Sequence, residues 1–186
     1  MIRADINGVC FELESHPDLF SPRRIDAGTL AMLSCVEFAE NDKVLDLGCG
    51  YGVVGIYAAK ILSEAGVFLL DSEPVAIETA TKNANANNFS DLSITQSDGF
   101  RDFHETGFTK ILCNPPYHAD FSVAKRFILK GFNRLEIGGE MWFVTKRDKW
   151  YRNKFRSVFG TVQSQLIDGY FVISAHKTSA SYARTR

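Results

Sequence analysis

The sequence predicts an α/β fold in which a mostly parallel sheet of seven strands is covered by helices on both faces. Short apolar runs alternate with segments whose apolar residues recur at helical spacing. Several runs are apolar throughout, as expected of strands buried on both faces. The last two runs are separated by Asp168-Gly169, a two-residue turn that joins antiparallel neighbours, so the last strand is expected to be antiparallel.

The first 40 residues are expected to form an N-terminal extension, followed by a core over 41–186 within one domain of 186 residues. Asn7-Gly8 lies between two alternating runs and predicts a β-hairpin. Residues 27–40 carry apolar side chains at helical spacing and predict a helix.

Strands and helices alternate through the core. The expected strands are the apolar runs at 43–47, 67–70, 92–95, 111–113, 141–145, 162–167 and 170–174. The expected helices cover about 53–63, 74–85 and 122–135. Pro74 fits the second helix because a prolyl ring is tolerated in the first turn. Since ligands of such sheets bind beyond the carboxyl ends of the strands, the residues that end each strand are the candidate site.

Composition is that of an ordinary soluble protein, with 45% hydrophobic and 23% charged residues. No apolar run reaches the roughly 18 residues of a membrane span, and the acidic N-terminus does not resemble a signal peptide. The four cysteines, Cys10, Cys35, Cys49 and Cys113, form no C-x-x-C pair. We therefore expect a cytoplasmic protein with reduced thiols, no metal site and no membrane association.

Charge is distributed unevenly along the chain. The net charge is −1, but ten basic and three acidic residues give residues 125–156 a charge of +7 and leave −8 elsewhere. Such asymmetry is typical of a surface that faces phosphates. A solvated helix face with a loop is the alternative interpretation.

The first core strand runs into Asp46-Leu47-Gly48-Cys49-Gly50-Tyr51-Gly52. These glycines allow a sharp turn and a close approach of a ligand to the backbone, the next helix points its N-terminus at the site, and Asp46 can hold a ligand ammonium. A tight turn without a ligand is the structural alternative. Gly50-x-Gly52-x-x-Gly55 with Asp71 also matches a dinucleotide pattern, so a NAD-dependent oxidoreductase is a distant alternative. It leaves Asp46 and Asn114 unexplained.

Two further acids follow strands. Asp71 can accept hydrogen bonds from two ribose hydroxyls, or it can cap the helix that begins near Pro74. Asp98 can accept a hydrogen bond from an adenine amine and Phe100 can cover the ring, although 97–100 is also a common turn sequence.

The fourth core strand ends in Asn114-Pro115-Pro116-Tyr117, the most informative motif of the chain. The two prolines fix the backbone and remove two N–H donors. An Asn114 amide oxygen and a backbone carbonyl then form two acceptors for one –NH2 group, while Tyr117 offers a flat face for stacking. An amine conjugated into a ring is a poor nucleophile, and two acceptors raise its electron density without a strong base.

These motifs resemble those of the small-domain (MTS) family of class I methyltransferases that depend on S-adenosylmethionine (AdoMet), above all the bacterial ribosomal RNA guanine 2-amino methyltransferases. The likeness covers nearly the whole chain. It extends to Leu19–Arg23 with Asp26, Gly28 and Thr29, which resemble a segment that closes over the cofactor, and to 138–142 and 169–175. The larger relatives carry an additional N-terminal domain that helps to select RNA, and no counterpart is expected here.

The resemblance implies a Rossmann-like sandwich with AdoMet across the strand ends. The implied cofactor contacts are Asp46, Gly48 and Gly50 at the methionine half, Asp71 at the ribose, Asp98 and Phe100 at the adenine, and Thr29 in the closing segment. The implied catalytic residues are Asn114, Pro115 and Tyr117.

The implied reaction is methyl transfer to an exocyclic amine, most simply the guanine 2-amino group in ribosomal RNA, on a base flipped out of its stack. The basic residues Lys146, Arg147, Lys149 and Arg152 are the expected RNA contacts. Tyrosine in the catalytic motif also occurs in adenine amino methyltransferases and in glutamine-amide methyltransferases of a release factor, so both remain alternatives. The oligomeric state is left open.

Overall fold

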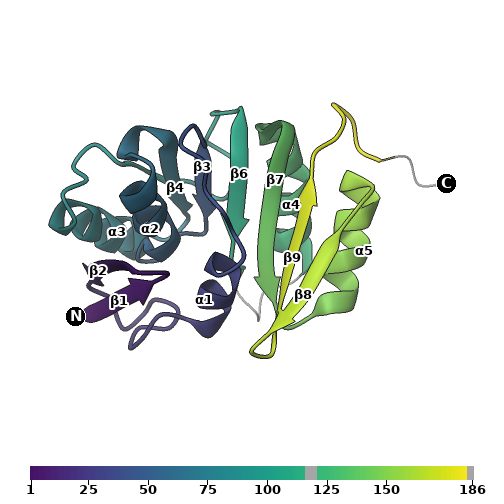
Figure 1. Ribbon diagram of the computed structural model, residues 1–186. Coiled ribbons are helices and arrows are strands. Elements are labelled where there is room, and N and C mark those ends of the chain that lie inside the picture. Colours follow the sequence, from purple (N-terminus) through teal and green to yellow (C-terminus); the bar gives the residue numbers. More distant parts are fainter. Residues whose placement is uncertain (116–120, 184–186) are drawn as a thin grey trace.

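The structure is a computed structural model that describes residues 1–115 and 121–183 (Figure 1). Its main sheet has seven strands in the order β5-β4-β3-β6-β7-β9-β8. The strands are β3 (Val44–Leu47), β4 (Val67–Asp71), β5 (Ser93–Gln96), β6 (Phe108–Cys113), β7 (Leu135–Thr145), β8 (Gln163–Ile167) and β9 (Tyr170–His176). The first five are parallel to one another, and β9 is antiparallel to both β7 and β8. The predicted fold class is confirmed.

Helices cover both faces of this sheet and divide the core in two. The helices are α1 (Ala27–Leu33), α2 (Val53–Ile61), α3 (Pro74–Ala86), α4 (Phe121–Arg134), α5 (Asp148–Phe159) and the short 3-10 helix η1 (Glu64–Gly66). Buried residues of α1, α2 and α3 form one apolar cluster with the sheet, and those of α4 and α5 form the other. No helix within 1–115 or 121–183 is long and apolar enough to cross a membrane.

The N-terminal hairpin forms a separate two-stranded sheet of β1 (Ile2–Ile6) and β2 (Val9–Leu13) beside α2 and α3 (Figure 1). Asn7 and Gly8 both have positive φ, as the predicted two-residue turn requires. The buried side chain of Asn83 on α3 accepts a hydrogen bond from the Glu14 backbone N–H at 2.7 Å and donates one to the Glu14 carbonyl at 2.8 Å. The hairpin is therefore attached to the core by hydrogen bonds between the Asn83 amide and both backbone groups of Glu14, the residue after β2.

The predicted helix over 27–40 is too long, because α1 ends at Leu33. The Ser34 hydroxyl donates back to the Ala31 carbonyl, and the Cys35 N–H bonds the Met32 carbonyl in a tighter turn. Val36 nevertheless remains buried, with 6% of its surface exposed. The apolar spacing after Leu33 therefore comes from an irregular segment that packs against the core, and not from a longer helix.

Two further elements differ from the prediction. The strand expected at 141–145 begins at Leu135, directly after α4, and includes Gly138 and Gly139. This start requires glycine, because a Cβ on Gly139 would lie 2.8 Å from the Phe108 carbonyl oxygen, and the pairing with β6 shifts register there. The helix α5 was anticipated only as one interpretation of the basic segment.

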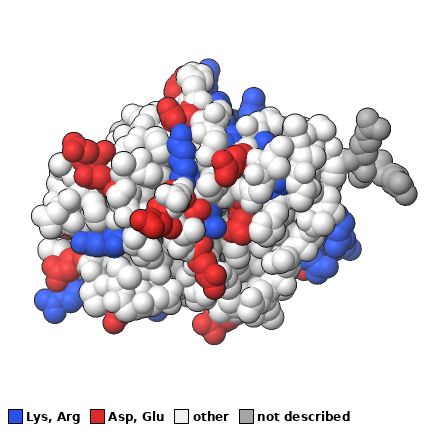
Figure 2. Space-filling model, turned by 45° about the horizontal axis from the view of Figure 1, so that its top comes forward, with Lys and Arg blue, Asp and Glu red and all other residues white. Residues whose placement is uncertain are grey.

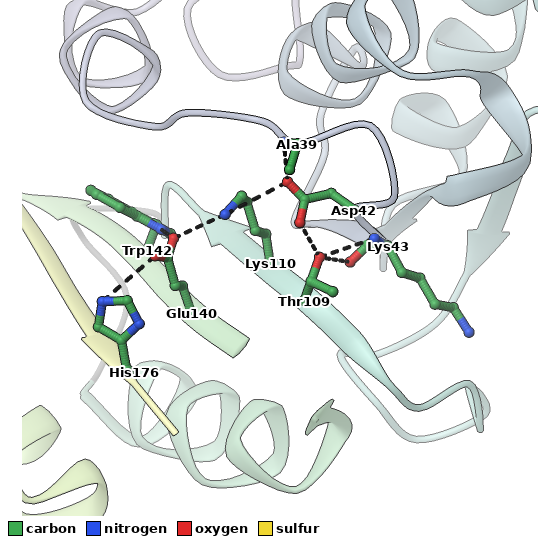
Figure 3. A network of polar contacts seen from close by, with 8 residues as sticks. All are labelled: Ala39, Asp42, Lys43, Thr109, Lys110, Glu140, Trp142 and His176. Carbon is green, nitrogen blue, oxygen red and sulfur yellow. Dashed lines mark hydrogen bonds and ion pairs between the residues drawn. The ribbon is translucent and has the colours of Figure 1, made fainter. Parts of the chain in front are cut away.

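A network of partly buried polar groups lies at the end of the sheet where the parallel strands begin (Figure 3). Lys110 Nζ lies 3.2 Å from a Glu140 oxygen and 3.6 Å from an Asp42 oxygen. The Thr109 hydroxyl donates to Asp42 at 2.6 Å, and the Trp142 indole donates to Glu140 at 2.8 Å. The network joins the turn before β3 to β6 and β7. Figure 2 brings this end forward and shows acidic and basic groups interspersed across it.

Candidate active site

A cavity of about 420 Å³ lies at the carboxyl ends of β3, β4, β5 and β6, with residues of the N-terminal extension along one side. Most of the residues predicted for the site line it: Thr29, Asp46, Gly48, Gly50, Asp71, Asp98, Asn114 and Pro115. Phe100 does not, and Tyr117 lies outside the described residues. The chain thus brings together residues separated by up to 86 positions.

The glycine turn after β3 presents bare backbone to this cavity. Gly48, Gly50 and Gly52 have φ values of 78°, 54° and 90°, in the region that favours glycine. The turn is fixed to β4 because the N–H groups of Gly48 and Cys49 both donate to the Leu70 carbonyl. A Cβ placed on Gly48 or Gly50 would meet no protein atom within 4 Å, so a ligand can approach the main chain closely here.

Asp46 lies in β3, just before the glycine turn, and is almost fully buried, with 3% of its surface exposed. One carboxylate oxygen accepts a hydrogen bond of 2.9 Å from the Gly55 N–H near the start of α2. Burial raises the Asp46 pKa to about 7; the Gly55 N–H opposes this shift, and the nearby Asp71 carboxylate adds to it. The charge of Asp46 therefore changes near neutral pH, and a cationic ligand group beside it would favour the ionised form.

Asp71 at the end of β4 links the glycine turn to α3. One of its oxygens accepts a hydrogen bond from the Gly50 N–H at 2.8 Å, and the other accepts one from the Glu73 N–H at 3.1 Å. Glu73 is the N-cap residue of α3, and the helix has no side-chain cap, so the capping interpretation of Asp71 is wrong: its carboxylate orders the turn before the helix instead. Since a carboxylate has about four lone-pair directions, it can also accept hydrogen bonds from ligand hydroxyls.

The loop after β5 holds Asp98, another acid of the cavity, in a different setting from the expected one. Asp98 forms a two-point salt bridge with Arg126 of α4. Phe100 is 7% exposed and packs in the core of the α4 side, with the Arg134 guanidinium 6.0 Å from its ring. The structure therefore does not bring Phe100 to the cavity.

Phe127 on α4 provides the aromatic wall instead. A Cβ on Gly99 would lie 2.7 Å from this ring, so glycine at 99 allows the loop after β5 to pack on it. The sequence interpretation missed Phe127 because its place in the helical apolar spacing indicated only a core residue.

Asn114 connects the end of β6 with the N-terminal extension. Its Nδ2 donates to Asp26 Oδ2 and to Thr29 Oγ1, both at 2.9 Å. Its Oδ1 is buried, and no group within 1–115 or 121–183 donates a hydrogen bond to it. Asp26 was not among the predicted site residues, although an acid just before a helical apolar pattern is the expected N-cap signal.

The segment before α1 borders the cavity, with Leu19, Phe20 and Ser21 among its lining residues. The Tyr51 hydroxyl of the glycine turn donates to the carbonyls of Ser21 and Arg24, at 3.4 and 3.3 Å. Ser21 itself has a positive φ of 52°. This segment is thus held against the turn after β3 by hydrogen bonds from the Tyr51 side chain to its backbone carbonyls.

The basic residues after β7 lie outside the cavity lining and contact aromatic or acidic neighbours. Arg147 lies 5.2 Å from the Phe121 ring, Lys146 Nζ lies 4.8 Å from the Tyr170 ring, and Arg152 pairs with Asp148 at 3.1 Å. Lys149 is exposed. Lys and Arg also gather at the right-hand edge of Figure 2, on the side of α5.

The two cysteines of the cavity are unsuited to nucleophilic catalysis. Cys49 and Cys113 line it and are buried, and burial raises the pKa of each thiol well above its usual value. Both thiols therefore stay protonated at neutral pH, and the polar chemistry of the cavity comes from its carboxylates, its backbone groups and Asn114.

Residues 10–175 match the family described as the methyltransferase small domain. The uncharacterized protein YbxB of Bacillus subtilis is 30% identical over 173 residues, which cover 90% of this chain and 86% of that protein. The ribosomal RNA large subunit methyltransferase G of Yersinia enterocolitica is 28% identical over 181 residues, covering 92% of this chain and 45% of the enzyme.

A solved structure gives a similar result. The T. thermophilus 16S rRNA N2 G1207 methyltransferase, in complex with AdoMet and guanosine, is 26% identical with a TM-score of 0.85, covering 94% of this chain and 49% of that chain. The chain therefore spans about half the length of both named rRNA enzymes. The residues that match the family, 10–175, span the glycine turn and Asn114.

Proposed function

The chain belongs to the methyltransferase small-domain family, and from this premise we propose that it transfers a methyl group from AdoMet to the 2-amino group of guanine in ribosomal RNA. The observation that carries the proposal is the buried Asn114 Oδ1, which accepts no hydrogen bond from the described residues and belongs to a cavity-lining side chain. A buried acceptor without a donor costs about 1–3 kcal/mol, so a ligand that brings an N–H group is favoured there.

The relatives support this choice of substrate class. Two of them are named as ribosomal RNA methyltransferases, and the Thermus enzyme is an N2 guanine methyltransferase whose structure holds guanosine and AdoMet. A nicotinamide-dependent oxidoreductase, which rested on Gly50, Gly52 and Gly55, receives no such support. Gly55 has a packing role instead, because a Cβ there would lie 2.5 Å from the Leu69 side chain.

The cavity residues fit AdoMet. The bare backbone at Gly48 and Gly50 leaves space for the methionine half, and the Asp46 carboxylate would attract its ammonium group. Asp71 would accept hydrogen bonds from the ribose hydroxyls, and Asp98 would accept one from the adenine amine beside the Phe127 ring. When bound, the cofactor supplies an electrophilic methyl group on a sulfonium.

Catalysis in this proposal is mainly positioning. Asn114 Oδ1 and the Pro115 carbonyl accept hydrogen bonds from the acceptor amine, which raises its electron density and directs its lone pair at the methyl group. Tyr117, which lies outside the described residues, is proposed to stack on the base. Neither thiol of the cavity takes part, since both remain protonated.

Residues 1–40 are proposed to act as the extension that closes over the cofactor, and residues 41–186 as the catalytic core. The contacts of the Tyr51 hydroxyl with the carbonyls of Ser21 and Arg24 support this division, because they join the extension to the cofactor-binding turn. Lys146, Arg147, Lys149 and Arg152 are proposed as contacts for the RNA backbone.

The test is methyl transfer from radiolabelled AdoMet into separated RNA and protein fractions of a methylation-deficient extract. The proposal expects label in ribosomal RNA, recovered as N2-methylguanosine after digestion and lost with Asn114→Ala. Asn85→Ala is the matched control, since Asn85 is exposed on α3 away from the cavity lining.

Other outcomes reject the proposed substrate. Recovery of methyladenosine would assign an adenine amine to the same site, and label confined to protein would assign a glutamine amide. Label in neither fraction, with AdoMet still bound, would remove the RNA assignment.

A further inference from the structure

The amide of Asn114 has two ends that differ in chemistry but hardly in shape. Its nitrogen offers two donors and its oxygen is an acceptor, so a rotation by half a turn exchanges the two. The orientation of this group therefore decides whether the end of β6 presents an acceptor or a donor to a ligand.

Asp26 removes the ambiguity. Its Oδ2 lies 2.9 Å from Asn114 Nδ2, and an ionised carboxylate can only accept hydrogen bonds. A flipped amide would place its oxygen against this carboxylate, two acceptors facing each other. Thr29 could not enforce the orientation alone, because its hydroxyl, 2.9 Å from the same nitrogen, can donate as well as accept.

Asp26 is itself held in place by the backbone. The same Oδ2 accepts the Thr29 N–H at 3.1 Å and so caps the N-terminus of α1. The helix α1 also buries Ala31, Met32 and Leu33 against the sheet. The residue that caps α1 thus also orients a side chain 88 residues further along the chain.

We infer that Asp26 is a positioning residue, which fixes the Asn114 amide so that its oxygen faces the ligand. The site would then select methyl-accepting groups that donate a hydrogen bond to this oxygen. A nucleobase edge that bears an amine satisfies Oδ1, whereas an edge that bears a carbonyl leaves two oxygens opposed. This selectivity rests on the proposed function, whereas the orientation of the amide rests on the contacts alone.

Two substitutions separate this role from a structural one. In Asp26→Asn, a side-chain oxygen can keep both hydrogen bonds of Oδ2, since both converge on that one atom. In Asp26→Ser, the hydroxyl still caps α1 but is too short to reach Asn114 as well. Both variants keep a favourable N-cap residue, so both are expected to fold.

The first readout needs no substrate. In ¹⁵N-labelled protein, the side-chain amide protons of Asn114 are expected to exchange slowly with solvent in the native protein and in Asp26→Asn. They are expected to exchange much faster in Asp26→Ser. Equal exchange in the native protein and in Asp26→Ser would overturn the inference.

The second readout is catalytic. For methyl transfer to ribosomal RNA, Asp26→Ser is expected to lower kcat roughly tenfold or more, a larger effect than on the Kd for AdoMet, while Asp26→Asn keeps most of the native kcat. An equal loss in both variants would overturn the inference by showing that only the charge matters. A native protein that methylates no RNA would reject the proposed function, and the exchange experiment would still decide the role of Asp26.

Discussion

The Asp98 carboxylate and the Arg126 guanidinium form a two-point salt bridge at the wall of the cavity, with nitrogen–oxygen distances of 2.6 and 3.3 Å. Both side chains are about half exposed, at 49% and 45%, so the pair contributes little to the stability of the fold. Its effect is instead to hold the carboxylate in one orientation beside the cavity.

If Asp98 accepts a hydrogen bond from the adenine amine, Asp98→Ala should weaken AdoMet binding about tenfold, the usual effect of losing a hydrogen bond to a charged group. The measurement is titration calorimetry with AdoMet and with an analogue that carries hypoxanthine in place of adenine. The analogue lacks the amine, so its affinity should not depend on Asp98. Asp102→Ala, an exposed acid of the same loop, is the control. An equal loss for both ligands would argue against the amine contact.

AdoMet affinity should depend on pH through Asp46. The pKa of this carboxyl is raised to about 7 by burial, so lowering the pH through 7 neutralises the group that would attract the ligand ammonium. The Kd is therefore expected to rise as the pH is lowered from 8 to 6, and Asp46→Asn should bind weakly with little change over this range. A pH-independent Kd in the native protein would contradict this role.

The stability of the ligand-free protein should change in the opposite sense. The Asp46 carboxyl has an ordinary pKa of 3.8 when unfolded and about 7 when folded, so the folded state binds the proton more tightly. Its contribution is therefore present at low pH and is lost as the pH rises from about 4 to 7. Asp46→Asn should weaken this decline, which thermal melts without AdoMet at several pH values would detect. A similar decline in both proteins would assign the pH dependence to other groups.

Two glycines of the same motif should respond differently to alanine. Gly48→Ala places a methyl group in the open cavity at a positive φ, so it should cost about 1 kcal/mol and mainly weaken AdoMet binding. Gly55→Ala places its methyl group 2.5 Å from Leu69, so it should cost about 1–3 kcal/mol of stability. Urea unfolding and calorimetry separate the two effects. Adding Leu69→Ala should partly relieve only the Gly55 variant.

The network of Figure 3 should make Lys110 important for stability. Lys110→Met would leave the Asp42 and Glu140 carboxylates, which are 8% and 21% exposed, without their shared cation. Removal of one partner from a buried ion pair typically costs about 3–5 kcal/mol, measurable by urea unfolding. Lys82→Met removes the exposed pair with Glu78 and should cost at most about 1 kcal/mol. Equal effects would show that burial does not strengthen the network.

The fold was predictable because its strands are short apolar runs with polar or glycine residues at their ends. Asp46 and Asp71 lie at the carboxyl ends of β3 and β4, and Asn114 directly follows β6, so the parallel topology alone brings them to one end of the sheet. The turns at Asn7-Gly8 and Asp168-Gly169 were equally predictable, because both residues of each turn need a positive φ.

The remaining differences arise where local pattern and tertiary packing diverge. The segment after Leu33 buries Val36 without being helical, and Phe127 takes the place at the cavity that Phe100 was expected to have. Apolar periodicity reports only that a side chain is buried, not which surface it meets. Asp26 was missed for a related reason, since its contact with Asn114 joins segments whose proximity no local pattern encodes.

The place of β9 between β7 and β8 bears on how the chain is made. During synthesis β8 emerges from the ribosome before β9, yet in the sheet it contacts β7 only through β9. Until Tyr170–His176 has emerged, the hydrogen-bonding edge of β7 stays open and β8 has no partner in the sheet. An open edge of this kind is prone to pairing with other chains. A nascent chain stalled before Tyr170 should therefore depend on chaperones far more than one released after His176.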